Sequence, residues 1–216
     1  LAFAEQQLAG QKEALDYATQ IRAALASGQL GDPQRVIGEL RTRAGRFKAQ
    51  DPRGQPVRDT IAALERHQRV LAARGYAAVA FASGDRMLAA YDYVTAAGEY
   101  AAGLKALREN GDPADPDIAK YERKRQDAED RARRIATLMP RIAPIAMDPG
   151  LAAKATLEQA FGEADEVVRL QPTNTDAQIY RNRIADKLRQ LDAQAQARAN
   201  AAALWNDGRR LYEGGD

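Results

Sequence analysis

The residue types that carry most enzyme chemistry are scarce in this chain. Its 216 residues contain one histidine, His67, and no cysteine. Without thiols there is no thiolate zinc site or cysteine nucleophile, and a single imidazole supplies neither a paired general base nor a metal ligand set. His67 stands in a strongly charged stretch, so we expect a surface histidine. The sequence predicts a non-catalytic chain without cofactor or metal, although 30 acidic residues leave chemistry by carboxylates alone open.

Three aspartates, Asp112, Asp115 and Asp117, lie close enough in sequence to suggest a calcium loop. An EF-hand loop alternates oxygen ligands around a central glycine and ends in a distal glutamate. Here prolines occupy two intervening positions, and Gly111 precedes the aspartates. We therefore expect these side chains to cap the helix that follows and to complement its dipole.

Tyr91, Tyr93 and Tyr100 are the candidate protein-binding residues. Tyrosine offers a large, rigid contact area with a polar tip, which suits recognition of a partner. The same side chains suit packing between short helices whose other residues are alanine and glycine. We prefer the packing interpretation and keep a peptide-binding groove as the alternative.

The densest run of charge, residues 120–134, holds seven basic and four acidic side chains. Opposite charges three or four residues apart pair on a helix, so we expect a solvated helix face with much of its charge locally paired. An anionic partner surface is the alternative. The whole chain has a net charge of only +2, and it contains no aromatic platform or DNA-reading helix, so nucleic acid is not an expected partner.

Composition predicts an all-α fold. The chain has 46 alanines, whereas valine, isoleucine and threonine, which favour strands, number only 24 together. Helices with so many small side chains must pack closely. No stretch approaches the roughly 18 apolar residues of a membrane-spanning helix.

Glycine, proline and Ser-Gly-Asp breaks divide the chain into about nine predicted helices. Their approximate ranges are 2–26, 33–50, 57–82, 87–97, 100–109, 116–139 and 150–170, then one long helix or two collinear ones over 173–212. Pro140, Pro144 and Pro149 predict short turns over 140–149. In the last helix an apolar stripe begins at Ile184 and reaches Tyr212, and we expect it to pack on the same chain or on another copy.

The carboxyl-terminal region resembles the tetratricopeptide repeat family. Ala160, Ala164, Val167 and Leu170, followed by Pro172-Thr173-Asn174, are similar to the second helix of a hairpin and its turn. Leu204, Gly208 and Leu211, followed by Gly215-Asp216, resemble the first helix and turn of another. The resemblance implies an irregular solenoid of antiparallel helical hairpins with small residues where the helices meet.

We therefore expect an all-α array with a helical-hairpin region at 1–139, a Pro-rich connector at 140–149 and a tetratricopeptide-like region at 150–216, excerpted from a longer protein. The predicted function is a non-catalytic scaffold that binds protein partners or a peptide segment, with self-association possible through the helix after Thr173. Two alternatives stay open: a structural subunit of a larger assembly, possibly in a cell envelope, and a regulatory or sensor region attached to an enzyme or membrane segment elsewhere.

Overall fold

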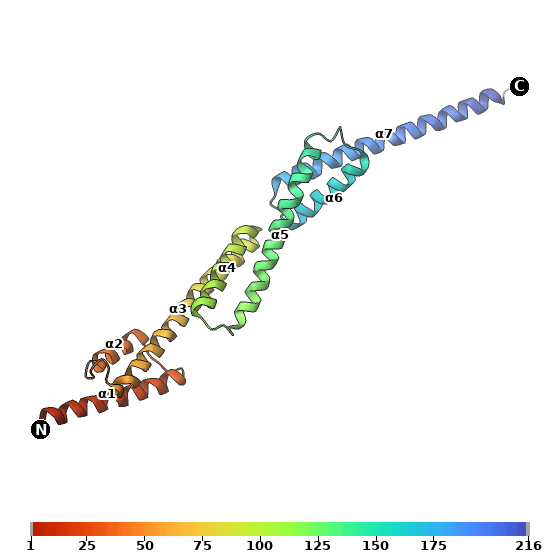
Figure 1. The fold of residues 1–216 in the computed structure, drawn as a ribbon. Helices are drawn as coiled ribbons and strands as arrows, with labels where there is room; N and C mark the ends of the chain where they lie inside the picture. The colour runs from red at the N-terminus through yellow and green to blue at the C-terminus, as the bar shows by residue number, and fades with distance from the viewer. Residues whose placement is uncertain (1, 215–216) are drawn as a thin grey trace. The chain divides into compact units, whose positions relative to one another are not determined.

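The computed structural model describes residues 2–214, with side chains from residue 4, and in that range the fold is all-α, as predicted. It contains seven α-helices and one short 3₁₀ helix, Pro52–Gly54 (Figure 1). The helices are α1 Ala2–Ala26, α2 Pro33–Ala44, α3 Gln55–Ala89, α4 Tyr93–Asn110, α5 Pro116–Met147, α6 Lys154–Leu170 and α7 Thr175–Glu213. None of these helices is long and apolar enough to cross a membrane.

Contacts divide the chain into two compact units. The first comprises Leu1–Ala82 and Ala101–Glu122, and the second comprises Ser83–Tyr100 and Arg123–Asp216. Helices α3, α4 and α5 each contribute residues to both units. The boundaries of these units differ from those of the predicted regions 1–139 and 150–216. The division into those regions stays a prediction.

In the first unit, α1, α2 and the start of α3 share one hydrophobic core. Its buried members are Ala14, Ala18, Val36, Ile37, Leu40, Phe47, Val57 and Leu64. Asp32 caps α2 by accepting a hydrogen bond from the Gln34 amide at 3.0 Å. The helix ends at Ala44 rather than near Gln50, because the chain turns there and buries Phe47 in the core.

In the second unit, the carboxyl-terminal half of α5, all of α6 and the start of α7 pack together. The core consists of Leu138, Ile142, Ala146, Leu157, Ala160, Ala164, Val167, Ala177 and Ile184. Two ion pairs, Lys154 with Asp192 at 2.5 Å and Arg181 with Asp165 at 3.4 Å, show that α6 and α7 run antiparallel. The small side chains of Ala160 and Ala164 are buried in this core, and Figure 1 shows α6 and α7 side by side.

The expectation of about nine helices was wrong: the three helices predicted over 57–109 are two, α3 and α4, with a turn at residues 90–92 inside the predicted helix 87–97, and the region 173–212 holds the single helix α7. Gly84 is within α3, where a Cβ atom would come 2.6 Å from Cε1 of Tyr100, so it marks a close approach and not a turn. Gly98 lies inside α4. Pro140 and Pro144 lie inside α5, so the predicted connector is helical as far as Met147. Buried contacts of Leu138 and Ile142 with the core offset the hydrogen bonds that the prolines remove.

The last helix, α7, is a single helix of 39 residues, one of the two forms that the sequence predicts. Its stripe packs on the same chain through Ile184, Leu188 and Leu191. Beyond that, Leu204, Trp205, Leu211 and Tyr212 are exposed. The predicted turn at Gly215-Asp216 lies outside the described residues.

Candidate functional site

The turn between α3 and α4 holds Tyr91 in an unusual backbone conformation. Its φ is +63°, and among the described residues it is the one non-glycine with a positive φ. The Asp92 amide donates to the Met87 carbonyl at 2.9 Å, and the Tyr91 amide donates to the Leu88 carbonyl at 3.1 Å. This is the Schellman pattern of a helix end, in which the left-handed position normally carries glycine. Tyrosine at this position costs about 1–2 kcal/mol of backbone strain, and such strain is often retained at functional sites.

Neighbouring groups hold this turn against the end of α6. The hydroxyl of Tyr93 donates to the Leu170 carbonyl, and the side-chain amide of Gln171 donates to the Tyr91 carbonyl at 3.2 Å. The rings of Tyr91 and Tyr93 meet edge to face, with centroids 6.5 Å apart. Arg131 lies over the Tyr93 ring at 5.6 Å. The hydroxyl of Tyr93 and the carboxylate of Asp127 raise the pKa of Arg131.

Tyr91 and Tyr93 line a hollow of about 320 Å³ between the start of α4 and the middle of α5. The exposed side chain of Val94 and the half-buried side chain of Ile135 contribute apolar surface to it. Gln171 and Asp92 supply polar groups at its edge. A mostly apolar lining with a few polar groups is the usual composition of a binding pocket.

Tyr100 does not belong to this hollow. Its side chain is fully buried, and its hydroxyl donates to Oδ1 of Asp85 at 2.5 Å. Lys124 donates to the same oxygen at 2.6 Å. The structure therefore brings Tyr91 and Tyr93 together at a recess. Tyr100 instead packs between α3 and α4, as the packing interpretation expects.

Of the aspartates near residue 115, Asp115 caps α5, Asp112 holds the turn before it, and Asp117 lies in its first turn. Asp112 accepts from the Ala114 amide at 2.9 Å and Asp115 from the Asp117 amide at 3.1 Å, and Asp115 also pairs with Arg74 at 3.0 Å. The described residues contain no group of carboxylates, histidine or cysteine that could hold a metal ion.

His67 is half-buried on α3 rather than fully exposed. Within the charge run, three local pairs form as expected, whereas Glu122, Lys124 and Arg134 also pair with Arg108, Asp85 and Glu166 on other helices. The pairs along α5 are Arg125 with Glu129, Arg131 with Asp127 and Arg133 with Asp130. Much of the charge on this helix is therefore already matched within the chain.

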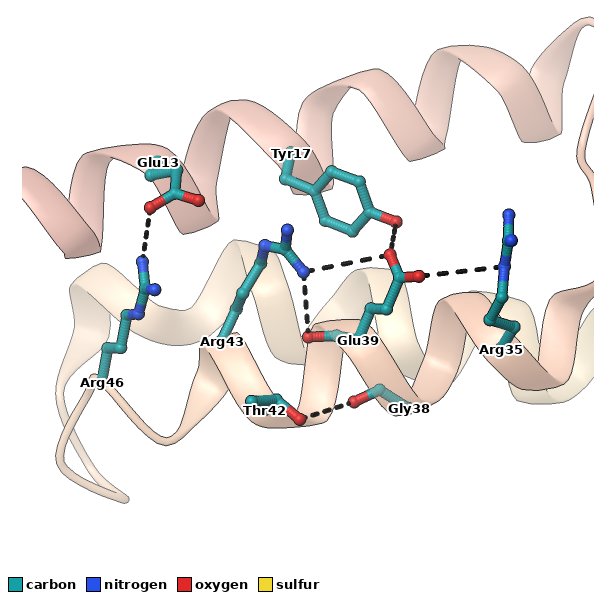
Figure 2. A network of polar contacts seen from close by, with 8 residues as sticks. All are labelled: Glu13, Tyr17, Arg35, Gly38, Glu39, Thr42, Arg43 and Arg46. Atoms are coloured by element: carbon teal, nitrogen blue, oxygen red, sulfur yellow. Dashed lines mark hydrogen bonds and ion pairs between the residues drawn. The ribbon is translucent and has the colours of Figure 1, made fainter.

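A polar network joins α1 to α2 in the first unit (Figure 2). Tyr17 donates its hydroxyl to the Glu39 carboxylate, and the Arg43 guanidinium lies 4.1 Å above the Tyr17 ring. Burial, and then the bond to Glu39, raise the pKa of Tyr17. Arg46 pairs with Glu13 at 2.8 Å, and this contact lowers the pKa of the carboxyl. These contacts link α1 to α2 and to the residue Arg46 that follows it, although the buried Nε of Arg43 has no hydrogen-bond partner within the described residues.

Sequence reasoning missed most of the residues around the Tyr91 hollow. Val94 and Ile135 were not singled out, and Gln171 lies 80 residues from the carbonyl that it contacts. No local pattern connects residues so far apart. The left-handed turn at Tyr91 also lacks the glycine by which such turns are usually predicted.

No model of a protein family matches this chain, and neither the curated proteins nor the solved structures yield a significant match.

Proposed function

We propose that this chain is a non-catalytic scaffold that binds a protein partner, with the hollow beside Tyr91 as its docking point. The observation that carries the proposal is the strained backbone of Tyr91 at the edge of an apolar recess. Glycine would relieve that strain, so the tyrosine ring is a costly choice for packing alone. The exposed Val94 beside it adds apolar surface that a partner's side chain could cover.

The proposal includes a tetratricopeptide-like architecture, an irregular array of antiparallel helical hairpins. Two features of the second unit support it. Ala160 and Ala164 are fully or almost fully buried between neighbouring helices, and the side chain of Asn174 caps α7 by accepting from the Ala177 amide at 3.0 Å after the Pro172 turn. Such arrays bind partners through extended helical surfaces.

A peptide library displayed on phage tests the docking point. The immobilised chain is panned beside two variants, Val94→Asp and Val79→Asp. Val79 is the matched control because it is a helical valine with similar exposure, 69% against 74% for Val94, and it does not line the hollow.

We expect the unmodified chain and Val79→Asp to enrich the same peptides, each with a large apolar residue, and Val94→Asp to lose them. A charge placed in an apolar recess opposes desolvation by an apolar side chain. Equal enrichment on all three proteins would refute the docking point.

A structural subunit that self-associates is the second candidate, and a specific observation favours it. The last turns of α7 expose Leu204, Trp205, Leu211 and Tyr212, which recur at a spacing of seven residues on one side of the helix. Sedimentation equilibrium tests this function. A monomer across the micromolar range, with no change on Trp205→Ala and Leu211→Ala, would exclude it.

A further inference from the structure

A second recess lies in the first unit, between α2 and α3, and its lining is more polar than that of the Tyr91 hollow. Its volume is about 700 Å³. Gln34, Gly38 and Arg41 face it from α2, with spacings of four and three residues that place them on one side of that helix. From α3, Glu65, Gln68 and Arg69 line the opposite wall.

The two arginines of this recess have donors to spare. Arg41 reaches Glu65 through a single contact of 2.8 Å, which uses only one of the several N–H groups of its guanidinium. Arg69 is exposed, and its side chain has no hydrogen-bond or ion-pair partner within the described part of the chain. The recess therefore carries two cations against one carboxylate.

The charge of the surrounding sequence adds to this local excess. Residues 32–75 contain ten Lys and Arg but five Asp and Glu, a net charge of +5, although the whole chain carries only +2. Glu39, the one acidic residue of α2, is already bound to Tyr17 on the side facing α1 (Figure 2). Part of this excess is already paired, because Arg46 contacts Glu13 and Arg74 contacts Asp115, but the unmatched cations still attract anionic ligands and raise their association rate.

We propose that the recess between α2 and α3 binds an acidic peptide segment, whose carboxylates pair with Arg41 and Arg69. The amides of Gln34 and Gln68 carry both donors and acceptors, which match the N–H and C=O groups of an extended peptide backbone. The face of α2 from Gln34 to Arg41 is about 10 Å long, enough for roughly three extended residues.

A peptide fits these observations better than a nucleic acid. The Glu65 carboxylate in the wall repels a continuous row of phosphates, whereas carboxylates on alternate peptide residues can contact the arginines and leave a neutral residue beside Glu65. The recess also lacks an aromatic ring for base stacking. This site is independent of the Tyr91 hollow and uses none of its residues.

Fluorescence anisotropy tests the inference on the whole chain. The probe is a short fluorescein-labelled peptide of alternating glutamate and serine, and the same peptide with glutamine in place of glutamate is the ligand control. The variants are Arg69→Gln and the double variant Arg41→Gln with Arg69→Gln. Arg198→Gln is the matched control, because Arg198 is also exposed and unpaired in the described part of the chain but lies on α7.

We expect saturable binding of the glutamate peptide that weakens as salt is added. Affinity should fall about five-fold for Arg69→Gln and about ten-fold or more for the double variant. Arg198→Gln should bind like the unmodified chain. Because Arg69 has no partner to lose, its variant keeps the fold, and circular dichroism checks this.

Four results would overturn the inference. They are absence of binding to the glutamate peptide, equal binding of the glutamine peptide, an equal loss of affinity on Arg198→Gln, and an unchanged affinity in the double variant. Tighter binding of oligodeoxythymidylate than of the peptide would assign the recess to nucleic acid instead.

Discussion

Replacing Tyr91 by glycine and by alanine separates the strain of its backbone from the contacts of its ring. Both changes remove the ring and its edge-to-face contact with Tyr93, worth about 0.5–1.5 kcal/mol. Only alanine keeps the Cβ atom that makes a φ of +63° costly, by about 1–2 kcal/mol. Glycine therefore relieves this strain, but its greater freedom in the unfolded chain lowers the stability of the glycine variant by about 0.4–1 kcal/mol.

The expected order of stability follows from these magnitudes. Tyr91→Gly should unfold with a free energy close to that of the unmodified chain, and Tyr91→Ala should be less stable than Tyr91→Gly by about 0.5–1 kcal/mol. The bond from Gln171 to the Tyr91 carbonyl involves only the backbone of residue 91, so it is the same in both variants. Urea denaturation followed by circular dichroism measures the difference.

The comparison refutes the reasoning if Tyr91→Ala is as stable as Tyr91→Gly or more so. That result would mean that residue 91 does not adopt the left-handed conformation in solution, and the argument that strain is retained for recognition would fail with it. If instead the order holds, the peptide library should also show that Tyr91→Gly loses enrichment while it keeps its stability.

Two further predictions concern packing and pH. Gly84→Ala should destabilise the chain by about 1–3 kcal/mol, because its Cβ atom would meet the Tyr100 ring at 2.6 Å. In α4, the added Cβ atom of Gly98→Ala meets nothing within 4 Å, so this variant should be more stable by about 0.5–1 kcal/mol. Thermal melts of the two variants check both signs. The hydrogen bond from Arg134 lowers the pKa of Glu166 in the folded chain. The ionised Glu166 therefore stabilises the fold at pH values above the ordinary glutamate pKa, and this stabilisation is lost as the pH falls through the lower pKa of the folded state. Arg134→Gln should reduce the loss of stability on acidification, and an unchanged pH profile would contradict this.

Local signals in the sequence located some helix ends well. The helix predicted to begin at residue 33 is α2, and Asp32 directly before it satisfies one of its free amides. The helix break predicted at Gly84 was wrong. A glycine is equally compatible with a turn and with a close approach between helices, and the Tyr100 ring, 16 residues away, decides between them.

The tyrosines show the same division within the candidate site. The sequence predicts a segment suited to recognition or packing from these three residues. In the structure Tyr100 is buried, whereas Tyr91 and Tyr93 line the hollow. The recess itself depends on Ile135 and Gln171, which reach the turn only through the packing of α5 and α6.

The sequence by itself determined the class of fold. Alanine-rich composition with few β-branched residues favours helices, and the absence of cysteine removes thiolate chemistry, because these properties depend on residue type alone. Only the tertiary structure decided which breaks are real, which tyrosines meet and where charge gathers around a recess. Those outcomes depend on contacts between residues distant in the chain, such as Arg41 with Glu65 and Gln171 with Tyr91, and no local periodicity encodes them.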